Sequence, residues 1–301
     1  MNIAPALSKK VMNSERPRAS SDGGAFSWPR EFFGNRFVYT VISPRARGLS
    51  IGINMNPDRL CNFDCVYCEV ERSSPPTETS LDVEVMAMEL RSTLDRVYSG
   101  AIRSSPRYAN LPGELLQLRH VALSGEGEPT LCPNFAEAMQ EIVHVRAEAG
   151  HPFFKIILIT NATGLDAELV RRSLKMLTSQ DEVWAKMDVG SQGYMDRVNR
   201  PNQVALAKVM GNILLLGRER PVVIQSLFPL IAGQEPDEVE ITQFVNRLQE
   251  LKAAGALIPL VQIYSATRPM ANTACGHLPL KRLFAIARQV RRETGLNVEV
   301  F

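Results

Sequence analysis

Residues Asn54 to Val70 read NMNPDRLCNFDCVYCEV and place three cysteines, Cys61, Cys65 and Cys68, within eight residues. Three residues separate the first two cysteines, and two separate the last two. Soft thiolate ligands suit iron in a tetrahedral sulfur environment, so this loop can hold three corners of a cubane iron–sulfur cluster. The fourth iron would lack a protein ligand, and an open coordination position is where chemistry can take place.

The aromatic residue before the third cysteine completes the pattern. With Tyr67 the loop reads Cys-x3-Cys-x-aromatic-Cys, and in this pattern the chain resembles the radical S-adenosylmethionine superfamily. The alternative is a structural zinc site, which usually takes four protein ligands arranged in pairs. A second pair is missing, because Cys132 and Cys275 stand alone and the nearest histidine, His120, lies far along the chain. The spacing therefore favours a cluster over zinc.

Composition places the chain among ordinary globular proteins. It has 301 residues, of which 45% are hydrophobic and 22% are charged, enough for one large α/β domain or two smaller ones. The net charge of +2 gives no electrostatic case for nucleic acid as an obligate partner. The apolar runs are too short to cross a bilayer or to form a signal peptide, and five cysteines, three of them crowded together, indicate a reducing compartment. We expect a cytoplasmic protein without membrane association.

A repeat of strand and helix organises most of the chain. Residues 1–35 have little apolar periodicity and predict a mobile N-terminal tail before a domain over residues 36–301. Arg36 to Ile42 is rich in β-formers and predicts a strand that precedes this repeat, and residues 298–301 predict a further edge strand. Between them, short β-branched runs alternate with helical patterns, which indicates a parallel sheet with right-handed crossovers.

Six such units follow one another. The predicted strands are Leu49 to Asn54, Arg119 to Leu123, Phe154 to Thr160, Glu182 to Asp188, Val222 to Leu227 and Leu257 to Tyr264. The predicted helices are Leu81 to Tyr98, Phe135 to Ala149, Ala167 to Leu177, Gln203 to Leu216, Pro236 to Ala254 and Leu280 to Thr294. Asn134 and Glu137 predict a capping box, and Gly150, Gly255 and Gly295 mark helix ends. Six units are too few for a closed eightfold barrel, and the resemblance implies a partial (β/α)6 TIM-like barrel.

Functional residues of parallel β/α folds gather on the loops that follow the strands. After the second predicted strand, residues 124–130 read SGEGEPT, similar to the Gly-Gly-Glu motif of the superfamily. The resemblance implies that the motif binds the amino group of S-adenosylmethionine, and its site residues are Ser124, Gly125, Gly127 and Glu128. A fixed carboxylate and exposed carbonyls suit an ammonium group, and glycine allows a close backbone approach. The same residue types also form ordinary turns.

Later strands end in further polar residues. Asn161, beside Thr160, is a candidate for the ribose hydroxyls or carboxylate of the cofactor, although such residues also cap and turn chains. Gln225 and Tyr264 are candidate lining groups for cofactor or substrate, and we add Tyr67 to the candidate cofactor-binding residues. The neighbouring Ser226, Gln262 and Arg268 are further lining candidates, although such residues are more often satisfied within the protein.

The fourth predicted strand carries two charged residues on one face. Alternation along the strand directs Lys186 and Asp188 to the same side, into the barrel interior. An inward charge is costly unless it is paired or functional, so the two form a salt bridge or a substrate site. We take both as candidate catalytic residues. Similar strings occur in the branch of the superfamily that includes the wybutosine-type tRNA-modifying synthetases.

The resemblance implies a specific chemistry. A 4Fe-4S cluster on the three cysteines would bind S-adenosylmethionine at its fourth iron, cleave it reductively to a 5'-deoxyadenosyl radical, and so abstract hydrogen from a substrate. The substrate would be a peptide, a small metabolite or a tRNA base, and an electron donor such as flavodoxin or ferredoxin would supply the electron. A tRNA is weakly supported because the chain lacks a strongly basic signal. A structural zinc-binding module and an electron-transfer iron–sulfur protein stay open as alternatives.

Overall fold

The computed structural model describes residues 24–301 except 74, 77, 149, 267, 269, 271 and 273. One sheet of eight strands runs in the order β1-β2-β3-β4-β5-β6-β8-β10, antiparallel between β1 and β2 and parallel elsewhere. The strands are β1 Val38–Ser43, β2 Gly48–Asn54, β3 Leu118–Ser124, β4 Ile156–Thr160, β5 Glu182–Lys186, β6 Val222–Leu227, β8 Val261–Tyr264 and β10 Val298–Val300. A separate antiparallel pair joins β7 Pro229–Ile231 to β9 Cys275–His277.

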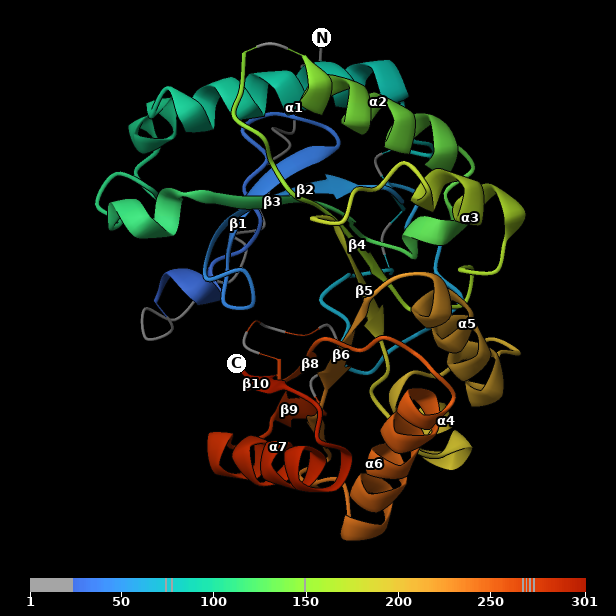
Figure 1. Ribbon diagram of the computed structural model, residues 1–301. Helices are drawn as coiled ribbons and strands as arrows, with labels where there is room; N and C mark the ends of the chain where they lie inside the picture. The colour runs from blue at the N-terminus through green and yellow to red at the C-terminus, as the bar shows by residue number, and fades with distance from the viewer. Residues whose placement is uncertain are drawn as a thin grey trace, which may run out of the picture.

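Helices cover the outside of the curled sheet (Figure 1). They are α1 Val83–Tyr98, α2 Phe135–Ala147, α3 Glu168–Leu174, α4 Gln192–Val198, α5 Leu206–Glu219, α6 Glu238–Ala253 and α7 Leu280–Thr294. Short 3-10 helices are η1 Ala25–Ser27, η2 Ala101–Ser104, η3 Gly113–Leu116 and η4 Pro129–Leu131. The open, mostly parallel sheet confirms the predicted partial barrel, with β1 and β10 as the predicted additional strands. No helix within the described ranges has the length and apolar character needed to span a membrane.

The two faces of the sheet differ in chemistry, because successive side chains of a strand point to opposite sides. On the face toward the helices, Ile51, Val121, Leu158, Val183 and Ile224 are fully buried in the main core. The opposite face lines the interior of the half-barrel and carries Ser50, His120, Ser124, Trp184, Lys186, Gln225 and Tyr264. A small apolar cluster of Ile157, Trp184 and Val223 fills part of this interior. The helices therefore stabilise one face and leave the other for a site.

Three local predictions differ from the structure. The capping box at Asn134 is wrong, because its Nδ2 donates to the carbonyl of Leu81 at 2.8 Å and its side chain makes no bond to α2. The strand predicted from Leu257 begins only at Val261, since Leu257 is 54% exposed and Pro259 has no N–H to donate. Residues 192–198 form α4, capped by Ser191, in a stretch too short to show helical periodicity.

The predicted mobile tail of residues 1–35 falls mostly outside the described residues. From Gly24 onward the chain contacts the body of the protein, and Phe26 and Phe33 pack against the core. Glu31 exchanges backbone hydrogen bonds of 2.9 and 2.8 Å with Thr40 of β1. Residues 24–35 therefore form part of the packed structure beside the sheet edge.

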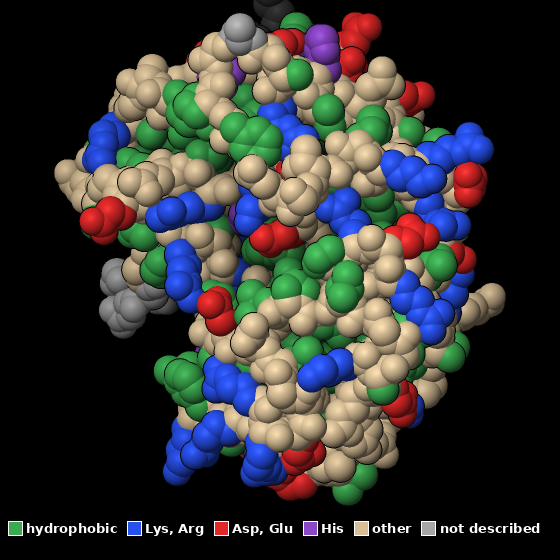
Figure 2. Space-filling view, viewed as in Figure 1, with side chains coloured by type: hydrophobic (Ala, Val, Ile, Leu, Met, Phe, Trp, Pro, Cys, Tyr) green, Lys and Arg blue, Asp and Glu red, His purple; other side chains and the backbone are tan. Residues whose placement is uncertain are grey.

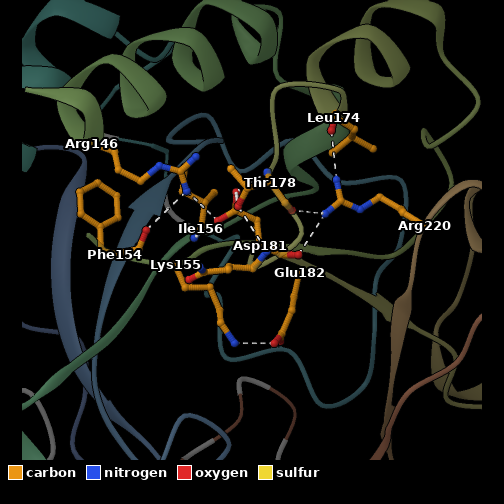
Figure 3. Close-up of polar contacts among 10 residues, drawn as sticks. Arg146, Phe154, Lys155, Ile156, Leu174, Thr178, Asp181, Glu182 and Arg220 are labelled. Atoms are coloured by element: carbon orange, nitrogen blue, oxygen red, sulfur yellow. Dashed lines mark hydrogen bonds and ion pairs between the residues drawn. The ribbon is translucent and has the colours of Figure 1, made fainter. Parts of the chain in front are cut away.

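A buried ion pair fixes the end of β5 that lies away from the cysteine loop (Figure 3). Arg146 of α2 donates to Asp181 at 2.7 Å, and their side chains are 7% and 0% exposed. The Asp181 carboxylate also accepts from the backbone N–H groups of Ile156 at 2.8 Å and Thr178 at 2.7 Å. Arg220 donates to backbone carbonyls of the same loop. These contacts join α2, β4 and β5.

Replacing Asp181 by alanine is expected to lower the free energy of unfolding by about 3 kcal/mol at pH 7, because Arg146 would stay buried without its partner. Burial opposes the charge on Asp181, but Arg146 and the backbone donors outweigh burial and lower the pKa. The stabilisation by this carboxylate is present above its unfolded pKa of about 4 and is lost as the pH falls through the lower folded pKa. Urea denaturation from pH 7 to pH 3 should therefore show the wild type and Asp181→Ala converging.

The control is Glu168→Ala, which removes a carboxylate that is 67% exposed and paired with Arg172. Its free energy of unfolding should change by less than about 0.5 kcal/mol. An Asp181→Ala protein as stable as this control at pH 7 would contradict the structural role of the ion pair.

Candidate functional site

The three cysteines of the loop after β2 line one pocket at the end of the half-barrel. Each sulfur has an N–H donor from elsewhere in the chain. Cys61 accepts from the backbone of Phe63 at 3.4 Å, Cys65 from Asn199 Nδ2 at 3.5 Å, and Cys68 from Arg72 Nη1 at 3.4 Å. Donors of this kind stabilise the negative charge of thiolates and of sulfur ligands on iron.

Three cysteine thiols are ligands that suit a cubane iron–sulfur cluster. Within the described part of the chain, no group of three or more His, Cys, Asp or Glu side chains is placed to hold one metal ion. A cubane cluster takes one thiolate per iron, so its ligands surround a volume and do not converge on a point. Burial raises the pKa of Cys61 to about 11 and that of Cys65 to about 12. The thiols therefore keep their protons until a metal displaces them.

Two glycines let the loop after β3 pack against the cysteine loop. A Cβ on Gly125, where φ is +133°, would lie 2.3 Å from Asn54 Oδ1, and one on Gly127 would lie 2.0 Å from the carbonyl oxygen of Leu60. The backbone N–H of Glu128 donates to that same carbonyl at 3.0 Å. The glycines thus allow a close approach between two protein loops, which is a structural reason for the motif in addition to the predicted approach of a cofactor.

The carboxylate of Glu128 joins the loops after β3 and β4. It is 2% exposed and accepts from Thr130 N at 3.1 Å, Thr130 Oγ1 at 2.7 Å, Thr160 Oγ1 at 2.5 Å and the backbone N–H of Asn161 at 2.7 Å. Burial raises the pKa of Glu128, and the four donors act in the opposite direction. Because protein donors surround this carboxylate, it positions both loops; its contact with the ammonium group of a cofactor stays a prediction.

Asn161 continues this connection to the cysteine loop. Its Nδ2 donates to Asn62 Oδ1 at 2.8 Å and lies 4.0 Å from Cys61 Sγ. Its Oδ1 accepts from the backbone N–H of Thr163 at 3.0 Å. Asn62 lies within the cysteine loop and was not singled out by the sequence analysis, although its place between two cysteines is a usable signal.

Asp188 is the centre of a second network. Its carboxylate accepts from the hydroxyl of Tyr67, from Asn199 Nδ2 at 2.8 Å and from the backbone N–H of Leu227 at 2.8 Å, and it pairs with Lys186 at 3.4 Å. Since the Asp188 side chain is 1% exposed and surrounded by donors, it holds Tyr67 and Asn199 against the cysteine loop. The predicted salt bridge between Lys186 and Asp188 is present.

Lys186 lines the interior of the half-barrel. Its Nζ donates to Tyr264 Oη at 3.2 Å and lies 4.8 Å from the centre of the Tyr67 ring. Burial works against the charge, but Asp188 and Tyr264 outweigh burial and raise the pKa of Lys186. Tyr264 Oη in turn donates to Gln225 Oε1 at 3.3 Å. Lys186 therefore presents a permanent ammonium charge between two phenol rings.

The pocket brings the predicted site residues together, with Asp188 enclosed by its donors and absent from the lining. The lining includes Cys61, Cys65, Tyr67, Cys68, Ser124, Gly125, Gly127, Glu128, Asn161, Lys186, Gln225, Tyr264 and Arg268. Cys132 and Cys275 are buried in the core and lie outside this lining. The sequence analysis missed Arg30, Arg45, Arg72 and Asn199, because lone arginines and asparagines follow no periodic pattern.

Residues before the sheet reach the mouth of the pocket. Arg30 donates to the carbonyl of Gly125 at 3.2 Å, and the carbonyl of Trp28 accepts from Arg268 Nε at 3.1 Å. This segment thus connects the loop after β3 with the loop after β8. Figure 2 shows an indentation on the left between the two halves of the molecule, with Lys and Arg side chains near its rim.

Comparisons with known proteins agree with this geometry. No family model matches the chain. The chain is 24% identical over 233 residues to a UPF0026 protein of Helicobacter pylori, in a match that covers 75% of this chain and 63% of that protein. A UPF0026 protein of Synechocystis is 26% identical over 168 residues, which is 54% of this chain and 52% of the relative. The chain is thus similar in sequence to these UPF0026 proteins. It spans roughly half to two thirds of the length of these relatives.

Solved structures share the fold of this chain. TYW1 with a lysine-pyruvate adduct bound has a TM-score of 0.55 at 16% identity, covering 86% of this chain and 84% of that chain. SuiB of Streptococcus suis bound to S-adenosylmethionine has a TM-score of 0.55 at 13% identity, covering 82% of this chain and 49% of that chain. At 13% and 16% identity these likenesses show a shared fold, which agrees with the partial barrel predicted from the sequence.

The glycine of the loop after β3 offers a test of this packing. Gly127→Ala is expected to lower the free energy of unfolding by about 2 kcal/mol, because the added methyl group would displace the cysteine loop at Leu60. Thermal denaturation of the protein without added metal measures the change. The control is Gly211→Ala in α5, whose added methyl group would meet nothing within 4 Å, and which should be neutral or stabilising by up to about 1 kcal/mol. Equal stability of the two variants would show that the loops are not in close contact.

Proposed function

We propose that this protein is a radical S-adenosylmethionine enzyme whose cluster is held by Cys61, Cys65 and Cys68. The observation that carries the proposal is the set of three sulfurs, each with an N–H donor, on one pocket that continues into a polar half-barrel. The sequence pattern of the loop and the fold shared with SuiB bound to S-adenosylmethionine support it. A zinc-binding module or a simple electron carrier would not explain the polar pocket inside the half-barrel.

The bound groups would supply the difficult chemistry: a 4Fe-4S cluster would provide one electron to cleave S-adenosylmethionine into methionine and a 5'-deoxyadenosyl radical, and the radical would remove hydrogen from a substrate. The chain positions those groups. Asn161 and the glycine-rich loop face the position next to the cysteines, where the nucleotide would bind. Lys186 provides a fixed positive charge farther inside, and Asp188 holds Tyr67 in place. The enclosed interior would keep water away from a radical.

The proposal also covers the class of substrate, the electron donor and the cellular compartment. The pocket is lined by strand and loop residues of one sheet, which suits a small molecule or the end of a peptide better than a folded RNA. An electron donor such as flavodoxin or ferredoxin would reduce the cluster in the cytoplasm. A neighbour that shares the fold was solved with a lysine-pyruvate adduct, and we assign Lys186 a charge role because it is ion-paired with Asp188.

Replacing Cys65 by alanine is expected to abolish cluster binding and the reductive cleavage of S-adenosylmethionine. After anaerobic reconstitution, the variant should lose the iron and sulfide content and the broad visible absorption, and it should form no 5'-deoxyadenosine with dithionite. The control is Cys275→Ala, a cysteine of the core outside the pocket lining, which should retain both. Full cleavage activity in Cys65→Ala would refute the assignment of the site.

Arg72 is expected to set the reduction potential of the cluster. Its Nη1 donates to Cys68 Sγ at 3.4 Å, and a positive donor at a ligand sulfur favours the reduced state. Arg72→Gln should therefore bind iron normally and show a more negative midpoint potential in a spectroscopic redox titration. Arg197→Gln is the control, because this arginine lies against the ring of Tyr194. An unchanged potential in Arg72→Gln would mean that Arg72 does not act on the cluster.

A further inference from the structure

The interior of the half-barrel contains a second group of polar residues, away from the cysteine loop. Its walls come from alternate positions on the strands, with Ser50 on β2, His120 on β3, Trp184 on β5 and Tyr264 on β8. The turn between β1 and β2 adds Arg45. His120 is 4% exposed and meets the Trp184 ring edge-on, with centroids 5.5 Å apart. These residues and the cysteines line the same continuous pocket.

Arg45 is a cation inside the half-barrel that has no carboxylate partner among the residues that the structure describes. Its guanidinium carbon lies 4.2 Å from the centre of the Tyr264 ring. Its Nε is shielded from solvent and has no hydrogen-bond partner, and Arg45 forms no ion pair among the residues that the structure describes. Burying a guanidinium donor without an acceptor is costly. A cation left in this state inside a pocket fits an acceptor that arrives with a ligand.

Three other cations that line the pocket pair with carboxylates, whereas Arg30 at its mouth lies over the Tyr39 ring with its guanidinium carbon 4.8 Å from the ring centre. Lys186 pairs with Asp188 at 3.4 Å, Arg72 with Asp64 at 3.8 Å, and Arg268 with Glu69 at 3.4 Å. On the same turn as Arg45, Arg47 is 69% exposed and pairs with Glu299 at 3.1 Å. The fold therefore places carboxylates beside three of these cations and leaves Arg45, like Arg30, with the face of a tyrosine.

The groups around Arg45 also favour an anion. Lys186 Nζ lies 5.5 Å from the centre of the same Tyr264 ring, so a negative group beside this ring would be attracted by both cations. Burial, Lys155 and Arg45 lower the pKa of His120 to about 3. His120 is therefore neutral, and it offers a ring N–H without adding charge.

We propose that Arg45, together with Lys186, binds the anionic group of a small organic substrate inside the half-barrel. The group is a carboxylate or a phosphate monoester, because both accept the paired N–H groups of a guanidinium. Trp184 and Tyr264 would contact the organic part of the substrate, with its other end toward the cysteine pocket. This inference rests on the proposed function only in taking the ligand as the substrate on which the radical acts.

The test uses the full-length protein without S-adenosylmethionine or reductant, and three matched probes at constant ionic strength. Phenyl phosphate carries the phosphate, phenylacetate carries the carboxylate, and benzyl alcohol is the neutral counterpart. Calorimetric titration is expected to give saturable binding of at least one anion, at least about tenfold tighter than benzyl alcohol. Whichever probe binds more tightly shows whether the site prefers a phosphate or a carboxylate. Weaker or equal binding of both anions relative to benzyl alcohol would overturn the proposal.

Two variants of the β1–β2 turn sharpen this test. Arg45→Gln should weaken binding of the preferred anion by at least about tenfold, whereas Arg47→Gln should stay within about twofold of the wild type. Without probes, Arg45→Gln should have a Tm no lower than that of Arg47→Gln, since it removes a guanidinium whose shielded Nε has no acceptor. Undiminished anion binding in Arg45→Gln, or a Tm below that of Arg47→Gln, would show that Arg45 does not serve a ligand.

A third variant separates this inference from the proposed function. Cys65→Ala should bind the anion as tightly as the wild type, because Arg45 belongs to another part of the pocket. If Cys65→Ala keeps a full cluster and full cleavage, the proposed function fails while the anion site stands. If the anion does not bind to the wild type but the cluster assembles and cleaves, the anion site alone fails.

Discussion

The two-residue period of the parallel strands is the constraint on which the rest of this structure depends. Because β2, β3, β5 and β6 place aliphatic side chains under the helices at every second position, the sheet gains its stability from one face. The other face is then free to carry Ser50, His120, Lys186 and Gln225 without loss of the core. A shift of one residue in any strand would exchange the two faces and destroy core and pocket together.

Two buried carboxylates convert this scaffold into a site. Glu128 takes donors from the loops after β3 and β4, and Asp188 takes them from Tyr67, Asn199 and β6. Each carboxylate is almost fully enclosed, and an enclosed charge is tolerated only when several hydrogen bonds converge on it. The cost of burial thus enforces the geometry, because loosening any one loop would leave a buried carboxylate with fewer hydrogen-bond donors. Loops that would otherwise be mobile are held against the cysteines in this way.

Much of the fold follows from local pattern, and much of the site does not. The strand–helix alternation and the cysteine spacing are written in consecutive residues, and β6 and α7 were predicted with the bounds that the structure has. Asn134 shows the limit, because its side chain bonds to Leu81, 53 residues earlier in the chain. Asn199 reaches Cys65 across 134 residues, and Arg45 reaches Tyr264 across the open side of the sheet. Contacts between residues so far apart in the sequence depend on how the sheet curls. The curl cannot be predicted from a short stretch of neighbouring residues.

The curl of the sheet also brings its two edges near each other without pairing them. β1 and β10 end the order of the sheet, and the β1–β2 turn meets the opposite edge through Arg47 on Glu299 and Arg45 on the Tyr264 ring. Backbone ladders join the neighbouring strands elsewhere, whereas these two contacts between the edges are made by side chains, and exposed ion pairs contribute little to stability. The two edges of the sheet are therefore held together more weakly than its neighbouring strands. A ligand that separates these two edges would break no strand pairing within the sheet. The cysteine loop would keep its position while the β1–β2 turn moves away from β8 and β10.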